Sequence, residues 1–285
     1  MKTRFDLDVV CNRIAHFLGM ACVTAGLSAC APEDNRSVTG FPSDISMIFS
    51  ASAEDWGYGA DGSVWQGGET FLVRLDGEEK RYVISDAVSG ELSADGTEPF
   101  FWKDNKDVTI DAWYPYNEGG LPEVVVKSDQ SSMDAYRASD YLAAMQTPVS
   151  ISLSTSPLEF SHRVANVVIR LEIDAELNPE DVLVTLMNVK GLDSGTDVKP
   201  YRRDNVFMAM VPPQNMQDVE FISVDAGAYS LTYAPDSFKE GYLRADRQYT
   251  WTFAIEKDSI KLIGTEGNPE WESDGEEEIE AEPVI

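Results

Sequence analysis

Alternation of apolar and polar residues is the feature that most limits the fold of this chain. From Gln248 to Ile255, large aromatic or branched side chains occupy every second position, with threonine and alanine between them. A period of two, in side chains that suit a pleated surface, predicts a half-buried β-strand. The polar run 256–258 then offers a turn, and the alternation resumes at Ile260 and Leu262, so we predict a β-hairpin.

The same pattern recurs along most of the chain. It predicts further strands at Ile45–Ser50, Phe71–Leu75, Arg81–Ile84, Val108–Tyr114, Ala165–Ile173, Val182–Met187, Val206–Val211, Val219–Val224 and Tyr229–Tyr233. Only Asp134–Met145 favours a helix. Many short strands separated by turn signals predict an all-β protein. There are more of these strands than one ordinary β-sandwich contains. Proline and a Ser/Thr cluster interrupt the pattern at Thr147–Pro157, so we expect one β-sandwich over residues 42–155 and a second over residues 156–285.

The N-terminus has the layout of a bacterial lipoprotein signal. Basic residues near the start precede an apolar stretch at Phe17–Gly26, and the run Leu27-Ser28-Ala29-Cys30 follows it. Small residues before a cysteine predict signal-peptidase cleavage between Ala29 and Cys30, with acyl chains such as palmitate on the new N-terminal cysteine. The alternative is a plain secreted protein in which this cysteine stands by chance.

This interpretation divides the N-terminal region into a signal peptide, residues 1–29, and a polar tether, residues 30–41. All three cysteines of the chain lie at or before the cut, which excludes a disulfide, a Cys-ligated zinc site and a thiol nucleophile in the mature protein. The formal net charge of −28 disfavours nucleic acid and anionic lipid as partners. Membrane attachment therefore has to come from the acyl chains.

No catalytic, metal-binding or cofactor site is predicted. His162 is the one histidine left after cleavage, and its place at the entry to an apolar strand indicates a structural residue rather than a general base. A multi-histidine metal site is excluded. Carboxylate pairs are inevitable among 50 Asp and Glu residues and carry no information, and the acidic runs do not have the spacing of a calcium loop.

Two further features each allow two interpretations. The aromatic residues Trp56, Tyr58, Trp65, Tyr114 and Tyr116 could stack on sugars, but the favoured interpretation is that they fill cores or cover loop bases. The C-terminal segment, residues 276–285, could form a strand, but its like charges favour a solvated acidic tail for the isolated chain.

A family resemblance comes from the order of several short motifs. The lipobox cysteine is followed by a first strand, and then by Trp65-Gln-Gly-Gly-Glu69, Ala112-Trp-Tyr-Pro115, Asp140-Tyr-Leu-Ala-Ala144, Leu158-Glu-Phe-Ser-His-Arg-Val-Ala165, Val211-Pro-Pro-Gln214 and a late Trp271. Each piece is weak alone, but their joint order over residues 27–271 is fairly specific. In this order of motifs the chain resembles the fimbrillin-like family, the type V pilins and their accessory subunits.

The resemblance implies two transthyretin-like β-sandwiches in tandem, carried as a lipoprotein to the outer membrane. Glu33 and Asp34 resemble the acidic signal that sends such lipoproteins to the cell surface. In pilins of this kind a protease removes the first strand, and a C-terminal strand of the next subunit fills the groove. The implied partners are other fimbrial subunits and cell-surface ligands.

The chain departs from the stalk pilins in two places. Such pilins are typically cut after an arginine in the loop that follows the first strand, and here no arginine lies between Arg36 and Arg74. The C-terminal segment is short, acidic and contains Pro283. We therefore expect a non-enzymatic structural or anchoring subunit of fimbriae at the outer membrane, held by Cys30. The alternative is a surface glycan-binding lipoprotein, and an enzyme ranks third.

Overall fold

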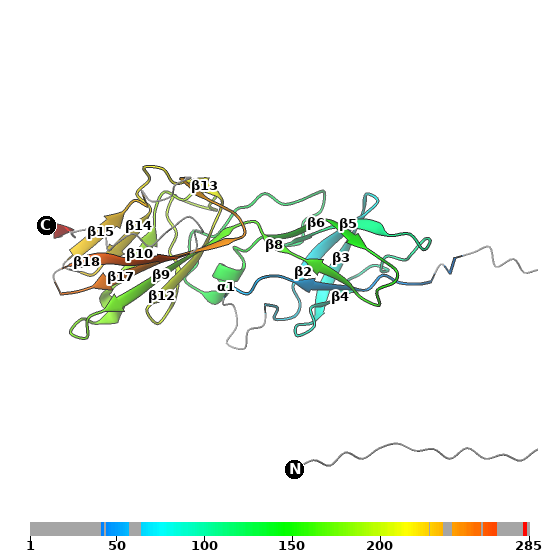
Figure 1. The fold of residues 1–285 in the computed structure, drawn as a ribbon, viewed down its shortest axis with the longest axis horizontal. Coiled ribbons are helices and arrows are strands. Elements are labelled where there is room, and N and C mark those ends of the chain that lie inside the picture. Colours follow the sequence, from blue (N-terminus) through cyan, green and yellow to red (C-terminus); the bar gives the residue numbers. More distant parts are fainter. Residues whose placement is uncertain are drawn as a thin grey trace, which may run out of the picture. The chain divides into compact units, whose positions relative to one another are not determined.

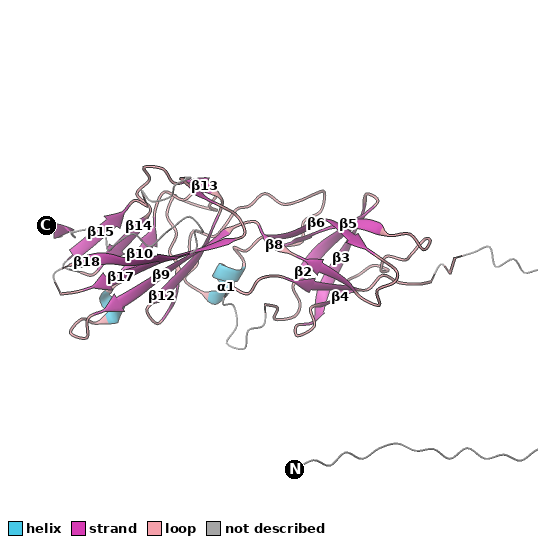
Figure 2. Ribbon diagram, viewed as in Figure 1, coloured by secondary structure: helices cyan, strands magenta, loops and turns pink. Residues whose placement is uncertain are grey.

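The computed structural model describes residues 41–42, 44–56, 64–227, 229–235, 241–257 and 259–266, and the backbone of residues 282–283 (Figure 1). Regular structure in these ranges is nearly all strand, with one short α-helix and one 3₁₀ turn (Figure 2). The prediction of an all-β chain is confirmed. No helix of the described part is long and apolar enough to span a membrane.

Eight strands of the first half form one sheet. The order of hydrogen-bonded strands across this sheet is β7-β1-β4-β3-β2-β5-β6-β8. The bounds are β1 Phe49–Ser52, β2 Thr70–Leu75, β3 Glu78–Asp86, β4 Glu91–Ala94, β5 Val108–Tyr114, β6 Leu142–Val149, β7 Ser156–Glu159 and β8 Ser161–His162. The two end strands, β7 and β8, are separated by Phe160 alone, so the sheet closes on itself through one segment. Its interior is one cluster of buried apolar side chains that includes Phe49, Phe71 and Tyr82.

The second half contains two larger sheets. A five-stranded sheet has the order β11-β12-β9-β17-β18, and a four-stranded sheet has the order β10-β14-β15-β19. The bounds are β9 Ala165–Ile173, β10 Leu183–Leu186, β11 Tyr201–Arg203, β12 Val206–Val211, β14 Ile222–Asp225, β15 Tyr229–Tyr233, β17 Arg247–Ile255, β18 Ile260–Glu266 and β19 Glu282–Pro283. Buried side chains of both sheets share one cluster, which makes this half a β-sandwich.

Three short elements complete the described structure. A 3₁₀ turn, η1, spans Pro179–Asp181, and β13 Gln214–Asn215 pairs with β16 Tyr242–Leu243. The helix α1, Met133–Arg137, is preceded by its N-cap residue Ser132, whose hydroxyl accepts a hydrogen bond from the backbone N–H of Ala135 at 3.2 Å.

The strongest sequence patterns correspond to the central strands. The predicted hairpin is β17 followed antiparallel by β18, and the four alternating residues from Tyr249 to Ile255 are all buried. The predicted strands at Val108–Tyr114 and Ala165–Ile173 match β5 and β9 residue for residue. These predictions are confirmed. A period of two is a reliable signal here because each of these strands packs one face on a core.

The predicted helix at Asp134–Met145 is wrong beyond Arg137. From Leu142 to Val149 the chain is strand β6, which pairs antiparallel with β5. Leu142 and Ala144 are buried in the core, and Ala143 between them is half-buried. Pairing with β5 thus overrides the local helix preference of an alanine-rich segment. The predicted strand at Val219–Val224 is also too early, since β14 begins at Ile222.

The outer face of β9 is covered in part by α1. The hydroxyl of Tyr136 donates to Oδ1 of Asn166 at 2.9 Å, and both side chains are fully buried. Val168, on the same face, belongs to a third apolar cluster with Tyr136, Trp56 and Met210. A polar residue in an apolar strand therefore has a hydrogen-bond partner here, as buried polar groups generally do.

The change of sheet does not coincide with the predicted boundary between residues 155 and 156. Residues 156–159 pair parallel with β1, and Ser161 and His162 pair antiparallel with β6. Both pairings belong to the first sheet, and β9 of the second half begins at Ala165. We therefore propose that the boundary between the two expected domains lies after His162.

Candidate functional site

The first strand lies inside the first sheet, between β4 and β7. On one side, Phe49 and Ser50 pair antiparallel with Leu92 and Glu91. On the other side, all four residues of β1 pair parallel with Ser156–Glu159. The strand therefore has a neighbour along both edges, and its removal would leave an open groove between β4 and β7.

Pairing starts before the strand proper and continues beyond it. Upstream, Met47 N–H donates to the carbonyl of Phe100 at 2.7 Å, and Trp102 N–H donates to the carbonyl of Ile45 at 2.9 Å. Downstream, Phe160 N–H donates to the carbonyl of Ser52 at 2.7 Å. The predicted strand at Ile45–Ser50 therefore lies in the sheet, but the continuous ladder is shifted to residues 49–52.

Side chains of this segment alternate between the core and the surface. Met47, Phe49 and Ala51 are buried, whereas the side chain of Ile48 is 45% exposed. The ring of Phe49 meets that of Tyr82 edge to face, with 5.5 Å between ring centroids. Phe49 is thus the main anchor of β1, and the groove that receives it is apolar.

The end of β1 is held by Gly90 and Trp65. Ala51 N–H donates to the carbonyl of Gly90 at 2.8 Å, and the indole N–H of Trp65 donates to the carbonyl of Ala51 at 2.9 Å. Gly90 has φ +68°, and a Cβ built on it would lie 2.1 Å from the carbonyl oxygen of Ala51. No side chain fits at this position while β1 is in place.

Substitution of Gly90 by alanine is expected to destabilise the chain by several kcal/mol, because a left-handed φ alone costs about 1–2 kcal/mol and the clash with Ala51 adds to it. The matched control is Gly77→Ala, which has φ +83° and open space around its Cβ. Urea unfolding of both variants gives the two free energies. Equal losses for Gly90→Ala and Gly77→Ala would contradict close packing of Gly90 against β1.

His162 fixes the segment that follows the first strand. Its Nδ1 lies 2.9 Å from Oδ1 of Asp140, and its Nε2 lies 3.0 Å from the backbone carbonyl of Glu54. The indole of Trp56 stacks on the imidazole with 3.5 Å between centroids and 14° between planes. The backbone N–H of His162 also donates to Asp246 at 2.9 Å. One side chain thus connects β8, Asp140 before β6, and the exit of β1.

Both ring nitrogens of His162 face acceptors, a carboxylate and a carbonyl. Only the imidazolium form can donate from both nitrogens at once. Burial opposes that charge, but the hydrogen bond and negative charge of Asp140, helped by Glu54 and Asp246, outweigh it, and the pKa of His162 is raised. The geometry therefore favours a buried His162–Asp140 ion pair, and neither nitrogen is left to act as a general base.

The other predicted sites fall into two groups. Cys30, Ala29, Glu33 and Asp34 lie outside the described residues, as does Tyr58. Trp56 and Trp65 are buried, which confirms the interpretation that they are core residues. Within the part of the chain that the structure describes, no group of three or more His, Cys, Asp or Glu side chains could hold a metal ion.

The C-terminal segment contributes a short strand. Glu282 and Pro283 form β19, which pairs antiparallel with Ser230 and Tyr229 at the edge of β15 (Figure 1). The rest of the acidic segment lies outside the described residues. The backbone of this segment can therefore add to a sheet edge in spite of its charge, although the pairing covers only two residues.

Sequence reasoning missed Gly90 and the partners of His162. Asp140 is 22 residues away and Glu54 is 108 residues away, and the contact with Glu54 uses only its backbone carbonyl, which no side-chain pattern reveals. A signal for Asp140 was present, because a buried histidine needs partners and Asp140 stands in one of the short motifs noted above.

Comparisons with known proteins agree with this architecture. A family model described as fimbrillin-like matches residues 52–269. A candidate cell adhesion protein from Bacteroides uniformis has 15% identity and a TM-score of 0.60, covering 80% of this chain and 99% of that one. A second one, from Bacteroides ovatus, has 16% identity and a TM-score of 0.56, covering 78% and 97%. A fimbrial protein from Bacteroides ovatus has 16% identity and a TM-score of 0.50, covering 74% and 48%. No curated protein matches the chain.

Proposed function

Because this chain belongs to the fimbrillin-like family, we propose that it is a non-enzymatic fimbrial subunit that anchors fimbriae to the outer membrane. The observation that carries the anchoring role is the first strand. From Ile45 to Trp56 the segment is paired, packed and then held by His162, over its whole described length. A subunit whose first strand stays in place keeps its N-terminus, and with it any lipid attached there.

The lipid anchor is Cys30 in this proposal. Cleavage between Ala29 and Cys30 makes Cys30 the N-terminal residue, which carries the acyl chains, and two or more such chains give stable anchoring where one does not. In sequence, the tether, residues 30–41, joins the lipid-bearing cysteine to the rest of the chain, and Glu33 and Asp34 serve as the signal for export to the cell surface. The absence of arginine between Arg36 and Arg74 supports retention of the first strand, because a protease with arginine specificity finds no site there.

Assembly with other subunits uses strand addition. Extended segments that join an open sheet edge gain backbone hydrogen bonds, while alternate side chains fix the register. The groove of β1 is occupied by the chain's own strand, so this subunit is not an acceptor at that groove while the strand is retained. Its C-terminal segment can pair with a sheet edge, as β19 does with β15, which supports a role in contact with the next subunit.

A non-catalytic role also agrees with the state of His162. Both of its ring nitrogens are engaged and its side chain has no exposed surface. The glycan-binding alternative expects exposed, coplanar aromatic side chains. Trp56 and Trp65 are buried, so these two side chains do not form an exposed, coplanar platform.

The test is the N-terminus of the protein on intact cells. We expect a mature chain that begins at Cys30, incorporates a palmitate analogue and sediments with outer membranes, whereas Cys30→Ala is released. Release should not change the fold, so unfolding of the purified Cys30→Ala protein serves as the control. An N-terminus beyond Ser52 on assembled fimbriae would show that the first strand is removed and would overturn the anchoring role.

A further inference from the structure

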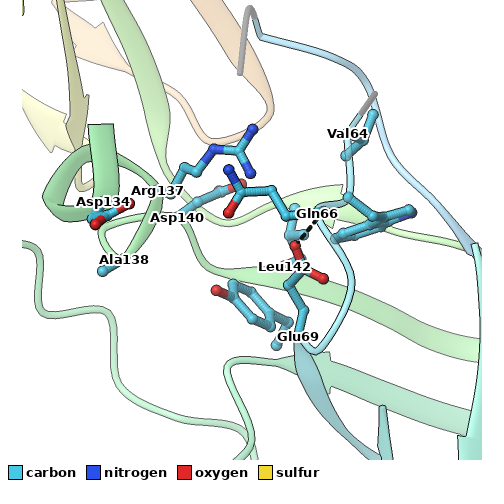
Figure 3. A pocket seen from close by; sticks show the side chains of 10 residues that line it. Val64, Gln66, Glu69, Asp134, Arg137, Ala138, Asp140 and Leu142 are labelled. Atoms are coloured by element: carbon cyan, nitrogen blue, oxygen red, sulfur yellow. Dashed lines mark hydrogen bonds between the residues drawn. The ribbon is translucent and has the colours of Figure 1, made fainter. Parts of the chain in front are cut away.

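A pocket of about 210 Å³ opens where four segments of the first half meet (Figure 3). It lies between α1, the turn before β2, the end of β5 and the start of β6. The volume is below the roughly 300–1,000 Å³ of pockets that hold drug-sized ligands, so it suits one small ring. None of the fimbrial roles discussed above uses this pocket.

The pocket has an aromatic wall with a polar tip. The half-buried ring of Tyr114 and the buried indole of Trp65 contribute to its lining. Both rings pack on Phe71, at centroid distances of 5.3 and 5.4 Å, which fixes their orientation. Burial, together with the charges of Asp140 and Glu69, raises the pKa of Tyr114 to about 12. Its hydroxyl therefore stays protonated and can donate a hydrogen bond at neutral pH.

Side chains that donate hydrogen bonds and side chains that accept them both line the pocket. The amide of Gln66 and the guanidinium of Arg137 extend into it, and Asp134 of α1 stands at its side (Figure 3). Glu69 is committed elsewhere, since its two carboxylate oxygens accept the backbone N–H groups of Gln66 and Gly67 at 2.7 and 2.9 Å. Asp140 is likewise engaged by His162.

The mixture of hydrogen-bond donors and acceptors in the lining indicates which class of ligand the pocket can bind. A site for an anion needs an excess of donors, and a site for a cation needs an excess of carboxylates. Here a carboxylate, an amide and a phenol lie beside an apolar wall, which matches a neutral ring with several hydroxyl groups. We propose that the pocket binds one monosaccharide unit at the end of a glycan. The proposal rests on the surface location given above, but not on the anchoring role.

Titration of the full chain with free monosaccharides tests the proposal. The panel contains neutral hexoses, 6-deoxyhexoses and N-acetylhexosamines, and binding is followed by saturation-transfer NMR. A ligand of this size is expected to bind with a dissociation constant on the order of 1–10 mM. Gln66→Ala and Asp134→Asn should each weaken binding about tenfold, the effect of one good hydrogen bond. Asp107→Asn, an exposed aspartate outside the lining, is the matched control.

Three results would overturn the sugar site: no saturable binding by any member of the panel, equal binding by all three variants, or tighter binding of acetate or butylamine than of any sugar. A glycan array then separates the sources, since a host glycan and a bacterial polysaccharide differ in their terminal residues. Capture of partner subunits by Asp134→Asn is measured in parallel. Normal capture with lost sugar binding separates this site from the assembly function.

Discussion

Replacing Phe49 by alanine is expected to lower the free energy of unfolding by about 3–5 kcal/mol, the usual cost of removing a fully buried phenylalanine. The loss has two parts, the apolar surface of the ring and the cavity that would remain beside Tyr82. For a chain of this size the melting temperature should fall on the order of 10 °C. Urea unfolding and thermal melts of the purified protein measure both quantities.

Ile48→Ala is the matched control, because it shortens a side chain of the same segment on the outer face, where 45% of Ile48 is exposed. Its expected cost is below about 1 kcal/mol. Similar losses for the two variants would show that the segment does not occupy the groove between β4 and β7 in solution. A large difference would confirm that the sheet depends on its own first strand.

The extent to which the fold follows from sequence can be seen by comparing β17 with β6. In β17 every second residue is a large apolar side chain, so local pattern and final burial agree, and the strand is predicted almost to the residue. In β6 the sequence Leu142-Ala-Ala-Met145 suits a helix equally well. This segment forms a strand because it pairs with β5, which lies more than 25 residues away in the sequence.

Polar residues inside strands show a second limit. Asn166 alternates with apolar neighbours, and by period alone it faces solvent. It is fully buried, because Tyr136 of α1 covers it and donates a hydrogen bond to its side-chain oxygen. Alternation predicts which residues share a face, but it does not predict what covers that face.

The candidate site, too, is only partly predictable from the sequence. The structural role of His162 follows from its sequence context, a single histidine at the start of an apolar strand. The need for a glycine at position 90 does not follow, because Gly90 reads as an ordinary turn residue. Its reason is the carbonyl of Ala51, which only the completed sheet brings within reach.

His162→Gln is expected to destabilise the chain by about 3–5 kcal/mol at pH 6, because it leaves the carboxylate of Asp140 buried without its counter-charge. Glutamine can still donate one hydrogen bond to the carbonyl of Glu54, so the main loss is the charge. Lys103→Gln is the matched control. It also removes a positive charge, from the exposed pair with Asp76, and should cost less than about 1 kcal/mol.

The stability conferred by His162 should depend on pH in a defined direction. The folded pKa is raised above the unfolded value of about 6.5, so the folded state holds this proton more tightly than the unfolded state. The contribution is therefore complete below about pH 6.5 and is lost as the pH rises through the folded pKa. The difference in unfolding free energy between the native chain and His162→Gln, measured from pH 5 to about pH 10, should shrink accordingly. A difference that stays constant over this range would show that folding does not raise the pKa of His162. The expected decrease would mean that the exit of the first strand is held more weakly in alkaline than in acidic surroundings.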